Sequence, residues 1–433
     1  MQLKPPYILR GHILSPIADA DLGWRLLHEP EGALAVDHNG LIVWSGSAKD
    51  CPMTSLGWPI QDTSHLIFPG FIDSHIHYPQ YHVRAAFGAD LLDWLERYTF
   101  PEEARFHALD YARGVAHEFT ETVLAHGVTT ALTFSTSHTE AFLALTETAH
   151  RRGLSVITGI TAMDRNAPDT VTRDLGYFRE ANAMAFAHLQ HFPRLGYAIT
   201  PRFALSCTED LLDSCGTFVA AHPDIWVQSH VNENPDEIAM TQALFPSADS
   251  YVDVYARHGL LTPKTVLAHS IFSQDHELEQ MAIAGTSVAH CPTSNTFLGS
   301  GLFRADRHLH ADIGITLGSD IGGGTSYSPF ATMAEAYKVG RLNGQSIAPD
   351  QLLYWHTLGS AQALKLDRVG TLTAGYWADF CLIDPTCSPL SEVRWNDRKD
   401  LLDGLFGLMF TLPESGGGVV ATMTAGQTRW SQL

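Results

Sequence analysis

Two histidines separated by one residue, His75 and His77, end an apolar stretch that begins at Pro69. Side chains alternate along a strand, so the two imidazoles lie on one face while Ile76 points away. Two neighbouring imidazoles can ligate a divalent metal ion. For this motif alone, a pair of packed or solvated histidines is an equally simple interpretation. The rest of the chain has to distinguish the two.

Further polar residues stand at the ends of other predicted strands. His230 ends the fifth strand expected in the central region, His269 ends the sixth, and Asp320 follows the eighth. In barrels of alternating strands and helices, the active site lies at the carboxyl ends of the strands. Each residue has a structural alternative, a strand cap for His230 and His269 and the N-cap of a following turn for Asp320. Taken together with the first pair, they predict a metal site whose ligands suit zinc, with Fe(II) or Mn(II) also compatible.

Two charged residues near this predicted site could act on a substrate. A bound metal lowers the pKa of water from about 15.7 to roughly 7, and hydrolysis then also needs a proton carrier. Glu233 stands three residues after His230 and suits that role, the alternative being a solvated glutamate at a helix start before Pro235. Arg202 follows the fourth strand and could hold a carbonyl oxygen or ring nitrogen. A surface salt bridge is its alternative.

The central region must supply these strands. Apolar segments alternate there with helical patterns, which is typical of a parallel sheet with crossover helices. Helices are expected at 101–126, stopped by Gly127, and at 277–284, stopped by Gly285. Eight strands in succession predict a closed (β/α)8 TIM-type barrel. They are expected at 71–77, 128–134, 154–161, 195–200, 225–231, 265–269, 286–290 and 315–319.

The two ends of the chain show a different pattern, with short strands and turns. Strands are expected at 7–9, 33–36 and 41–44, and again at 378–383 and 419–423, with a helical stretch at 401–410. Each terminal piece is too short to bury a core alone, so the two are expected to form one small flanking β-sandwich. The predicted domains are therefore a sandwich of residues 1–65 and 375–433, and a metal-dependent barrel of residues 66–374.

Composition restricts the partners of the chain. Its 433 residues are 45% hydrophobic, which allows a large core. Lys and Arg number 27 against 47 Asp and Glu, a formal charge of -20 that disfavours nucleic acid and anionic membranes. A nucleobase-like substrate should therefore be a free small molecule. The six cysteines form no Cys-x-x-Cys motif, so neither a disulfide framework nor a thiolate zinc site is expected. No signal peptide or run of about 18 apolar residues is found, and a cytoplasmic location is expected.

Several segments resemble the amidohydrolase superfamily and, within it, the guanine deaminases. The resemblance covers nearly the whole chain and is most specific where HIHYPQ combines with TPRF. The segments are PGFIDSHIHYPQ at 69–80, LLDWLERYTFP at 91–101, TPRFALSC at 200–207, HVNEN at 230–234, AHCPTSN at 289–295 and GSDIGGG at 318–324.

The resemblance implies a function and a set of roles. The expected reaction is deamination of guanine to xanthine and ammonia by a metal-activated hydroxide, with one Zn2+ per subunit, in a homodimer. The sequence differs from the family pattern at Asn232, where serine is expected, and at Ser319, where threonine is expected. The implied metal ligands are His75, His77, His230 and Asp320; the catalytic residues are Glu233 as proton shuttle, His269 and Asp320; and the substrate-binding residues are Gln80, Arg202, the backbone at Phe203, and Trp94.

Two other functions stay open at this point. A sister enzyme could deaminate a pterin or an oxidised guanine at the same metal site, since Gln80 and Arg202 would suit those edges as well. A barrel that serves only as an assembly subunit is the more distant alternative, but such a chain would be expected to have lost metal ligands, and none is missing here.

Overall fold

Eight parallel strands form the centre of the structure, a computed structural model that describes residues 1–88 and 90–433. They are hydrogen-bonded in the order β5-β6-β7-β9-β10-β11-β12-β13, and the short β8 pairs with β9. Their bounds are β5 Phe71–His77, β6 Val128–Phe134, β7 Ser155–Thr158, β8 Thr161–Ala162, β9 Gly196–Pro201, β10 Trp226–Val231, β11 Thr265–His269, β12 Ser287–His290 and β13 Ile315–Leu317.

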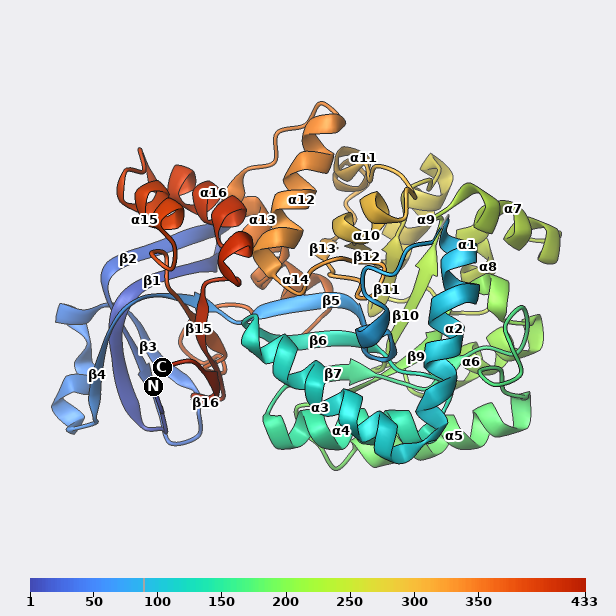
Figure 1. Cartoon of the computed structure of the whole chain (residues 1–433), viewed down its shortest axis with the longest axis horizontal. Coiled ribbons are helices and arrows are strands. Elements are labelled where there is room, and N and C mark those ends of the chain that lie inside the picture. Colours follow the sequence, from blue (N-terminus) through green and yellow to red (C-terminus); the bar gives the residue numbers. More distant parts are fainter. Residues whose placement is uncertain (89) are drawn as a thin grey trace.

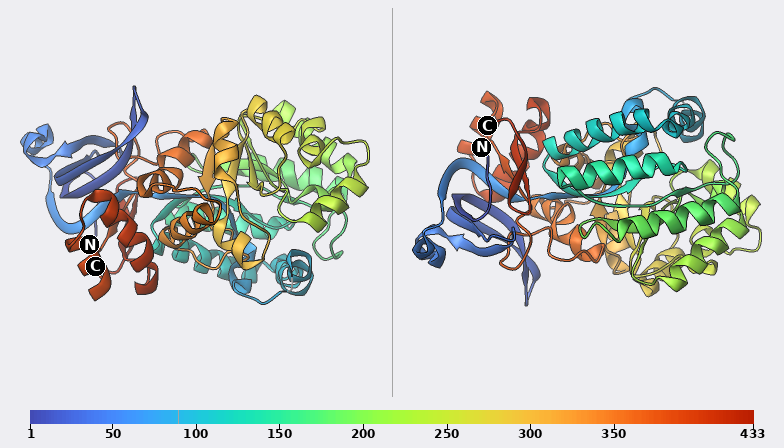
Figure 2. Two further views of the ribbon diagram at one scale, coloured as in Figure 1. Left: turned by 90° about the horizontal axis from the view of Figure 1, so that it is seen from above. Right: turned by 90° about the horizontal axis from the view of Figure 1, so that it is seen from below.

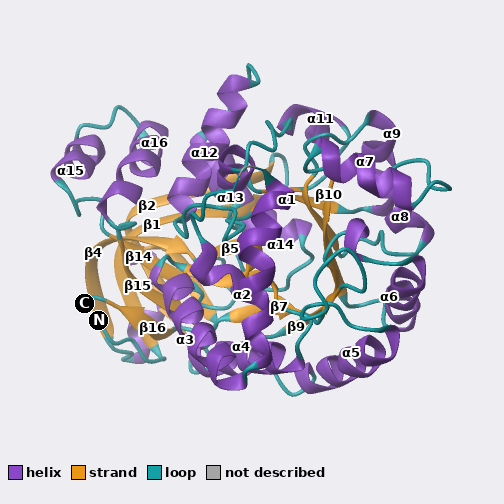
Figure 3. Ribbon diagram, turned by 45° about the vertical axis from the view of Figure 1, so that its right-hand side comes forward, coloured by secondary structure: helices purple, strands orange, loops and turns teal. Residues whose placement is uncertain are grey.

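The last strand returns to the first, so the sheet is nearly a closed barrel. Thr316 Oγ1 on β13 donates a hydrogen bond to Ser74 Oγ on β5 at 2.7 Å. Just beyond β13, the Asp320 amide donates to the His75 carbonyl at 2.8 Å. Helices surround these strands on the outside (Figures 1 and 3). The predicted α/β fold with a TIM-type barrel is confirmed.

The burial of the strands explains why the sequence located them well. Every residue of β5 and β6 is buried, as expected for parallel strands covered on both faces. These two strands and β11 have the predicted bounds. The strand predicted at 154–161 is instead divided into β7 and β8. Between them the backbone of Gly159 passes so close to its neighbour that a Cβ there would lie 1.8 Å from the Ala198 carbonyl oxygen.

The helices were predicted less accurately. The helix expected at 101–126 is broken, because Ala108 is extended (φ -87°, ψ 109°) between two helical segments. The one expected at 277–284 begins two residues earlier and ends at Gly285, which has a left-handed φ of 70°. The α-helices are α1 Leu91–Trp94, α2 Phe100–Ala104, α3 Leu109–Ala125, α4 Thr139–Arg152, α5 Leu175–Leu189, α6 Glu209–Ala221, α7 Pro235–Leu244, α8 Tyr251–Arg257, α9 Asp275–Ala284, α10 Pro292–Phe297, α11 Ala305–His310, α12 Pro329–Leu342, α13 Pro349–Trp355, α14 Leu358–Ala363, α15 Pro389–Asn396 and α16 Leu401–Thr411.

Both ends of the chain contribute to one further sheet, of seven strands, in the order β16-β15-β14-β4-β1-β2-β3. Figure 2 shows the blue and red ends of the chain together on one side of the barrel. Met1 N lies 2.5 Å from the Leu433 carbonyl oxygen. The strands are β1 Tyr7–Asp19, β2 Gly23–Val36, β3 Ile42–Ser47, β4 Ile60–Pro69, β14 Phe380–Ile383, β15 Val419–Thr424 and β16 Gln427–Ser431.

The terminal sheet joins distant parts of the chain. Strand β4 pairs in parallel with β1 and antiparallel with β14, so one strand links the N-terminal and C-terminal segments. Side chains from both segments, among them Leu9, Ile67, Phe380 and Met423, form one buried apolar cluster. The predicted flanking β structure built from both ends is therefore present, and the predicted domain boundaries at 65 and 375 stay a prediction.

The six cysteines are all free thiols in the structure. Five of them are buried, and Cys387 is exposed. As for membranes, no helix among the described residues has both the length and the apolar character needed to cross one.

Candidate metal and active site

Four imidazoles and one carboxylate meet at the carboxyl ends of the barrel strands. His75 and His77 come from β5, His230 from β10, His269 from β11, and Asp320 from the turn after β13. His77 Nε2 lies 3.2 Å from His75 Nε2 and 3.2 Å from His230 Nε2. A single proton on His77 Nε2 can serve only one of these nitrogens, so a cation among them would relieve the repulsion of their lone pairs.

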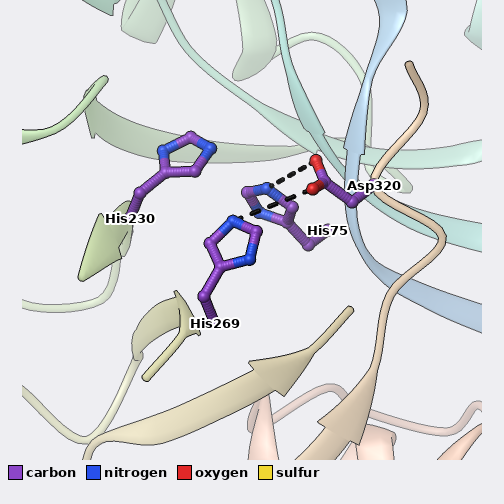
Figure 4. Close-up of side chains that lie close together, drawn as sticks. All are labelled: His75, His230, His269 and Asp320. Carbon is purple, nitrogen blue, oxygen red and sulfur yellow. Dashed lines mark ion pairs between the residues drawn. The ribbon is translucent and has the colours of Figure 1, made fainter. Parts of the chain in front are cut away.

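The carboxylate of Asp320 completes the cluster. Its Oδ1 lies 3.2 Å from His75 Nε2 and 3.3 Å from His77 Nε2, and its Oδ2 lies 3.8 Å from His269 Nε2. Figure 4 shows His75, His230, His269 and Asp320 turned toward one another, and the ligand atoms of these four lie within 4.8 Å of one another. His77 also contacts this group. The structure thus brings together all five residues that the sequence singled out for metal chemistry.

The protonation states suit a metal site. Burial lowers the pKa of His77 to about 3 and that of His230 well below its ordinary value, so both rings are neutral at pH 7 and keep a free lone pair. Burial alone would raise the pKa of Asp320, but the charge of His75 and the hydrogen bonds from His75 and His77 hold it well below its usual range. Neutral imidazoles and an ionised carboxylate are the ligand forms of these residues.

Hydrogen bonds behind the cluster orient two of the rings. His230 Nδ1 donates to the carbonyl of Arg202 at 2.5 Å, and His269 Nδ1 donates to Asn295 Oδ1 at 2.8 Å. In both rings the Nε2 atom is therefore left for the site. The Nε2 of His269 is buried and has no hydrogen-bond partner among the described residues. A metal ion, or a molecule bound to that ion, would give this nitrogen a partner.

The strand ends turn sharply into this site. Asn232, His269, Ser270 and Asp320 all have left-handed backbone conformations, with φ between 50° and 72°. Such conformations are costly for most residues other than glycine and cluster at functional sites. Asparagine tolerates this region best among them. The departure from the family pattern at Asn232 therefore has a physical basis, because serine fits this φ less well.

Glu233 is held inside the site and is only 3% exposed, which excludes the solvated alternative. Its Oε1 accepts a hydrogen bond from Ser300 Oγ at 3.1 Å, and its Oε2 lies 3.4 Å from His269 Nε2. Burial, together with the charge of Asp320, raises the pKa of Glu233 to about 8. A carboxyl with such a pKa can both hold and release a proton near neutral pH, as a general acid or base must.

A pocket with an empty volume of about 390 Å³ opens onto this cluster of histidines and Asp320. All of the substrate-binding residues predicted from the resemblance line it. Gln80 Oε1 accepts a hydrogen bond from the Gly322 amide at 2.9 Å, which fixes the side chain and leaves its NH2 group as a donor. The lining residues are His77, Gln80, Leu91, Trp94, Leu95, Arg202, Phe203, His230, Glu233, His269, Leu298, Asp320 and Gly323.

Trp94 and Phe203 contribute mainly apolar surface to this pocket. Trp94 is buried, and its Nε1 has no hydrogen-bond partner among the described residues, so an indole donor is available there. The carbonyl of Phe203 accepts from both the amide and the hydroxyl of Ser206, at 3.1 Å each. That carbonyl is therefore occupied within the protein.

Arg202 forms an ion pair that the sequence did not predict. Its Nη1 lies 2.7 Å from Glu103 Oε1 and 2.8 Å from Glu103 Oε2. The two side chains are 4% and 0% exposed, so the alternative of a surface salt bridge is wrong. Glu103 was missed because the pairing joins residues far apart in sequence, and a glutamate in a short helix carries no local mark of such a contact. Asn295 and Ser300 were likewise not assigned roles from the sequence.

Comparisons with known proteins agree with this site. The model of the amidohydrolase family matches residues 66–428. The chain is 40% identical to guanine deaminase of Escherichia coli (strain K12) over 347 residues, 79% of each chain. A solved structure of E. coli guanine deaminase superposes with a TM-score of 0.94 and 33% identity, covering 99% of this chain and all of the other.

A second solved structure, guanine deaminase of C. acetobutylicum with guanine bound in its active site, has a TM-score of 0.88 and 28% identity. It covers 98% of this chain and 99% of its own. The family match extends over most of the sequence, and the similarity to the E. coli relative covers four fifths of it. The chain belongs to the amidohydrolase family.

Proposed function

We propose that this chain is a guanine deaminase, which replaces the 2-amino group of guanine by oxygen to give xanthine and ammonia. One observation carries the proposal: the His/Asp cluster, Glu233 and the planar hydrogen-bond donors Gln80 and Arg202 all line the same pocket. The 40% identity to E. coli guanine deaminase supports the choice of substrate. So does the fold shared with the guanine-bound protein from C. acetobutylicum.

The resident metal in this proposal is Zn2+, one per subunit, held by His75, His77, His230 and Asp320. Three imidazoles and a carboxylate are a donor set that zinc favours, although Fe2+ or Mn2+ would also be accepted by these ligands. When bound, the metal supplies a water of lowered pKa as the nucleophile. Metal analysis of the purified protein by mass spectrometry tests both the identity of the ion and its stoichiometry.

Each remaining residue then has a task during deamination. A water oxygen must attack C2, the ring atom N3 must gain a proton, and the amine must leave as ammonia. Asp320 accepts a proton from the attacking water, and His269, whose Nδ1 donates to Asn295, accepts a hydrogen bond at Nε2 and so aligns that water. Glu233 delivers a proton to N3, which is supported by its raised pKa and its position 3.4 Å from His269 Nε2.

Four other residues that line the pocket recognise the base. Gln80 presents its NH2 group to the purine edge, and Arg202 donates to the ring carbonyl oxygen. The amide of Phe203 donates to a ring nitrogen, since its carbonyl is already occupied by Ser206. Trp94 covers the base with its indole ring. These assignments are supported by the burial of the four residues around one cavity.

The test is ammonia release from a panel of guanine, pterin and 8-oxoguanine, with the metal content measured on the same sample. We expect guanine to be the best substrate of the metal-loaded protein. If the protein instead prefers a pterin or 8-oxoguanine, that compound and not guanine is its substrate. A metal-loaded protein that releases no ammonia would support the non-catalytic alternative. Arg202→Ala should lower kcat/KM greatly at unchanged metal content, and an unchanged value would remove Arg202 from recognition.

We also propose a cytoplasmic homodimer. The six free thiols support a reducing compartment, and the dimer is supported by the family resemblance alone. Light scattering of the purified protein measures its mass, and the mass of a single chain would refute the dimer.

A further inference from the structure

The buried ion pair between Arg202 and Glu103 determines how the guanidinium faces the pocket. The Nη1 nitrogen carries two N–H donors. Both carboxylate oxygens of Glu103 lie within hydrogen-bond distance of it, at 2.7 and 2.8 Å. The N–H groups of Nη2 and Nε are then the part of the fork left for a ligand. Because both side chains are almost fully buried, water cannot replace Glu103 as the partner of Nη1.

Glu103 belongs to the segment that covers the pocket. This segment consists of α1, a π-helical turn at Leu95–Thr99, and α2, and it runs beside the barrel in cyan in Figure 1. Leu91, Trp94 and Leu95 on it line the pocket. Phe100, one helical turn before Glu103, places its ring 5.4 Å from the guanidinium carbon of Arg202. One short helix thus contacts the guanidinium with both a ring and a carboxylate.

The backbone of Arg202 is fixed independently from the other side. Its carbonyl accepts the hydrogen bond of His230 Nδ1 at 2.5 Å and also lies 3.4 Å from Ser229 Oγ. The position of the main chain is therefore tied to a proposed metal ligand, while the long side chain retains four rotatable bonds. The direction of the guanidinium depends on its partner Glu103.

We propose that Glu103 is a positioning residue that gives the site its specificity for a 6-oxopurine, an inference that rests on the proposed deamination of guanine. By holding Nη1, it directs the remaining donors of Arg202 toward the ring carbonyl oxygen. By neutralising the guanidinium, it makes recognition depend on the direction of a hydrogen bond rather than on charge. A site built to donate to an oxygen discriminates strongly against an analogue that lacks it.

The test compares Glu103→Gln with the wild type on two ligands that differ at the lactam of ring positions 1 and 6. Hypoxanthine carries the 6-oxo group and a proton on N1, and purine lacks both. Their binding to the metal-loaded protein is measured by calorimetry, and kcat/KM is measured on guanine. We expect the variant to bind hypoxanthine about 100-fold more weakly and to lose a similar factor in kcat/KM, while its affinity for purine stays the same within error. A merely structural role would weaken both ligands by the same factor, and that result would overturn the inference.

Two further variants control the comparison. Glu102→Gln makes the same change one residue earlier on α2, at a side chain that contacts Arg105 and His82 instead of Arg202, and it should bind both ligands as the wild type does. Glu103→Asp keeps the charge on a shorter side chain and should restore part of the preference for hypoxanthine. If Glu103→Gln does not fold, the Asp variant decides alone, and a preference equal to that of the wild type overturns the inference.

The inference and the proposed function can fail separately. A wild-type protein that holds metal and releases no ammonia from guanine refutes the proposed function. A wild-type protein active on guanine, combined with equal losses for the two ligands in the Glu103 variants, refutes the positioning role alone.

Discussion

Replacing Glu233 by glutamine tests the proton transfer most directly. Glutamine has the same shape and keeps an oxygen that can accept the hydrogen bond from Ser300. Burial, together with the charge of Asp320, raises the pKa of Glu233 to about 8, so the carboxyl is largely protonated at pH 7 and the neutral amide changes the charge of the site little. Metal binding and guanine binding should therefore survive, while the amide can no longer give or take a proton.

The size of the effect follows from the chemistry that is lost. A positioned general acid or base contributes about 100- to 10,000-fold, and the fall in kcat of Glu233→Gln should lie in that range, which corresponds to about 3 to 5.5 kcal/mol of barrier. Ser300→Ala is the comparison. It removes one neutral hydrogen bond, about 1 kcal/mol, so kcat should fall only several-fold.

The assay has three measurements on each protein. Ammonia release gives kcat and KM, mass spectrometry gives the metal content, and calorimetry with guanine gives the dissociation constant under conditions where the variant does not turn over. A Glu233→Gln protein with full metal content that retains more than about a tenth of the wild-type kcat refutes the role of Glu233 as proton carrier.

Three other predictions follow from the structure. Removal of the metal by a chelator should abolish activity and lower the Tm, because a ligand of the native state stabilises it, and added zinc should restore both; a Tm that does not move would argue against a metal held by this cluster. Burial lowers the pKa of His356 from 6.5 to about 4, so the native state binds fewer protons than the unfolded chain between these values, and stability should fall with falling pH there by up to about 3 kcal/mol. His356→Asn should flatten this decline in urea titrations, whereas an identical decline would show that the residue does not contribute. Asn232→Ala should cost about 2 to 4 kcal/mol of unfolding free energy, since it removes the amide that donates to Ser273 and Glu277 and strains a φ of 50°; Asn232→Gly should cost less, and equal costs would exclude the strain.

The barrel could be predicted from the sequence because its strands are buried on both faces. A continuous apolar run is visible without knowledge of its neighbours, and β5, β6 and β11 were located to the residue. The terminal sheet gave a weaker signal. Strand β4 was missed because its first six residues, 60–65, are polar or exposed and alternate poorly. Its pairing with β1 and β14 holds it extended, and neither partner is adjacent in the sequence.

The candidate site divides in the same way. Residues at strand ends could be assembled from the rule that barrel strands end on one face, which is why His75, His77, His230, His269 and Asp320 were found. Residues that approach from helices and loops could not be found by that rule. Glu103, Asn295 and Ser300 reach the site through tertiary packing, and nothing in their local sequence distinguishes them from ordinary helix or loop residues.

The terminal sheet has a consequence for synthesis of the protein on the ribosome. Strand β4 emerges before the barrel, but its partner β14 is made only after the barrel is complete. Until then the β4 edge has unpaired backbone groups, which are a template for pairing with other chains. One edge of β4 therefore stays unpaired while the whole barrel is translated. Chaperones that bind unfolded segments would therefore affect the yield of this protein most while the part of the chain between β13 and β14 is being translated.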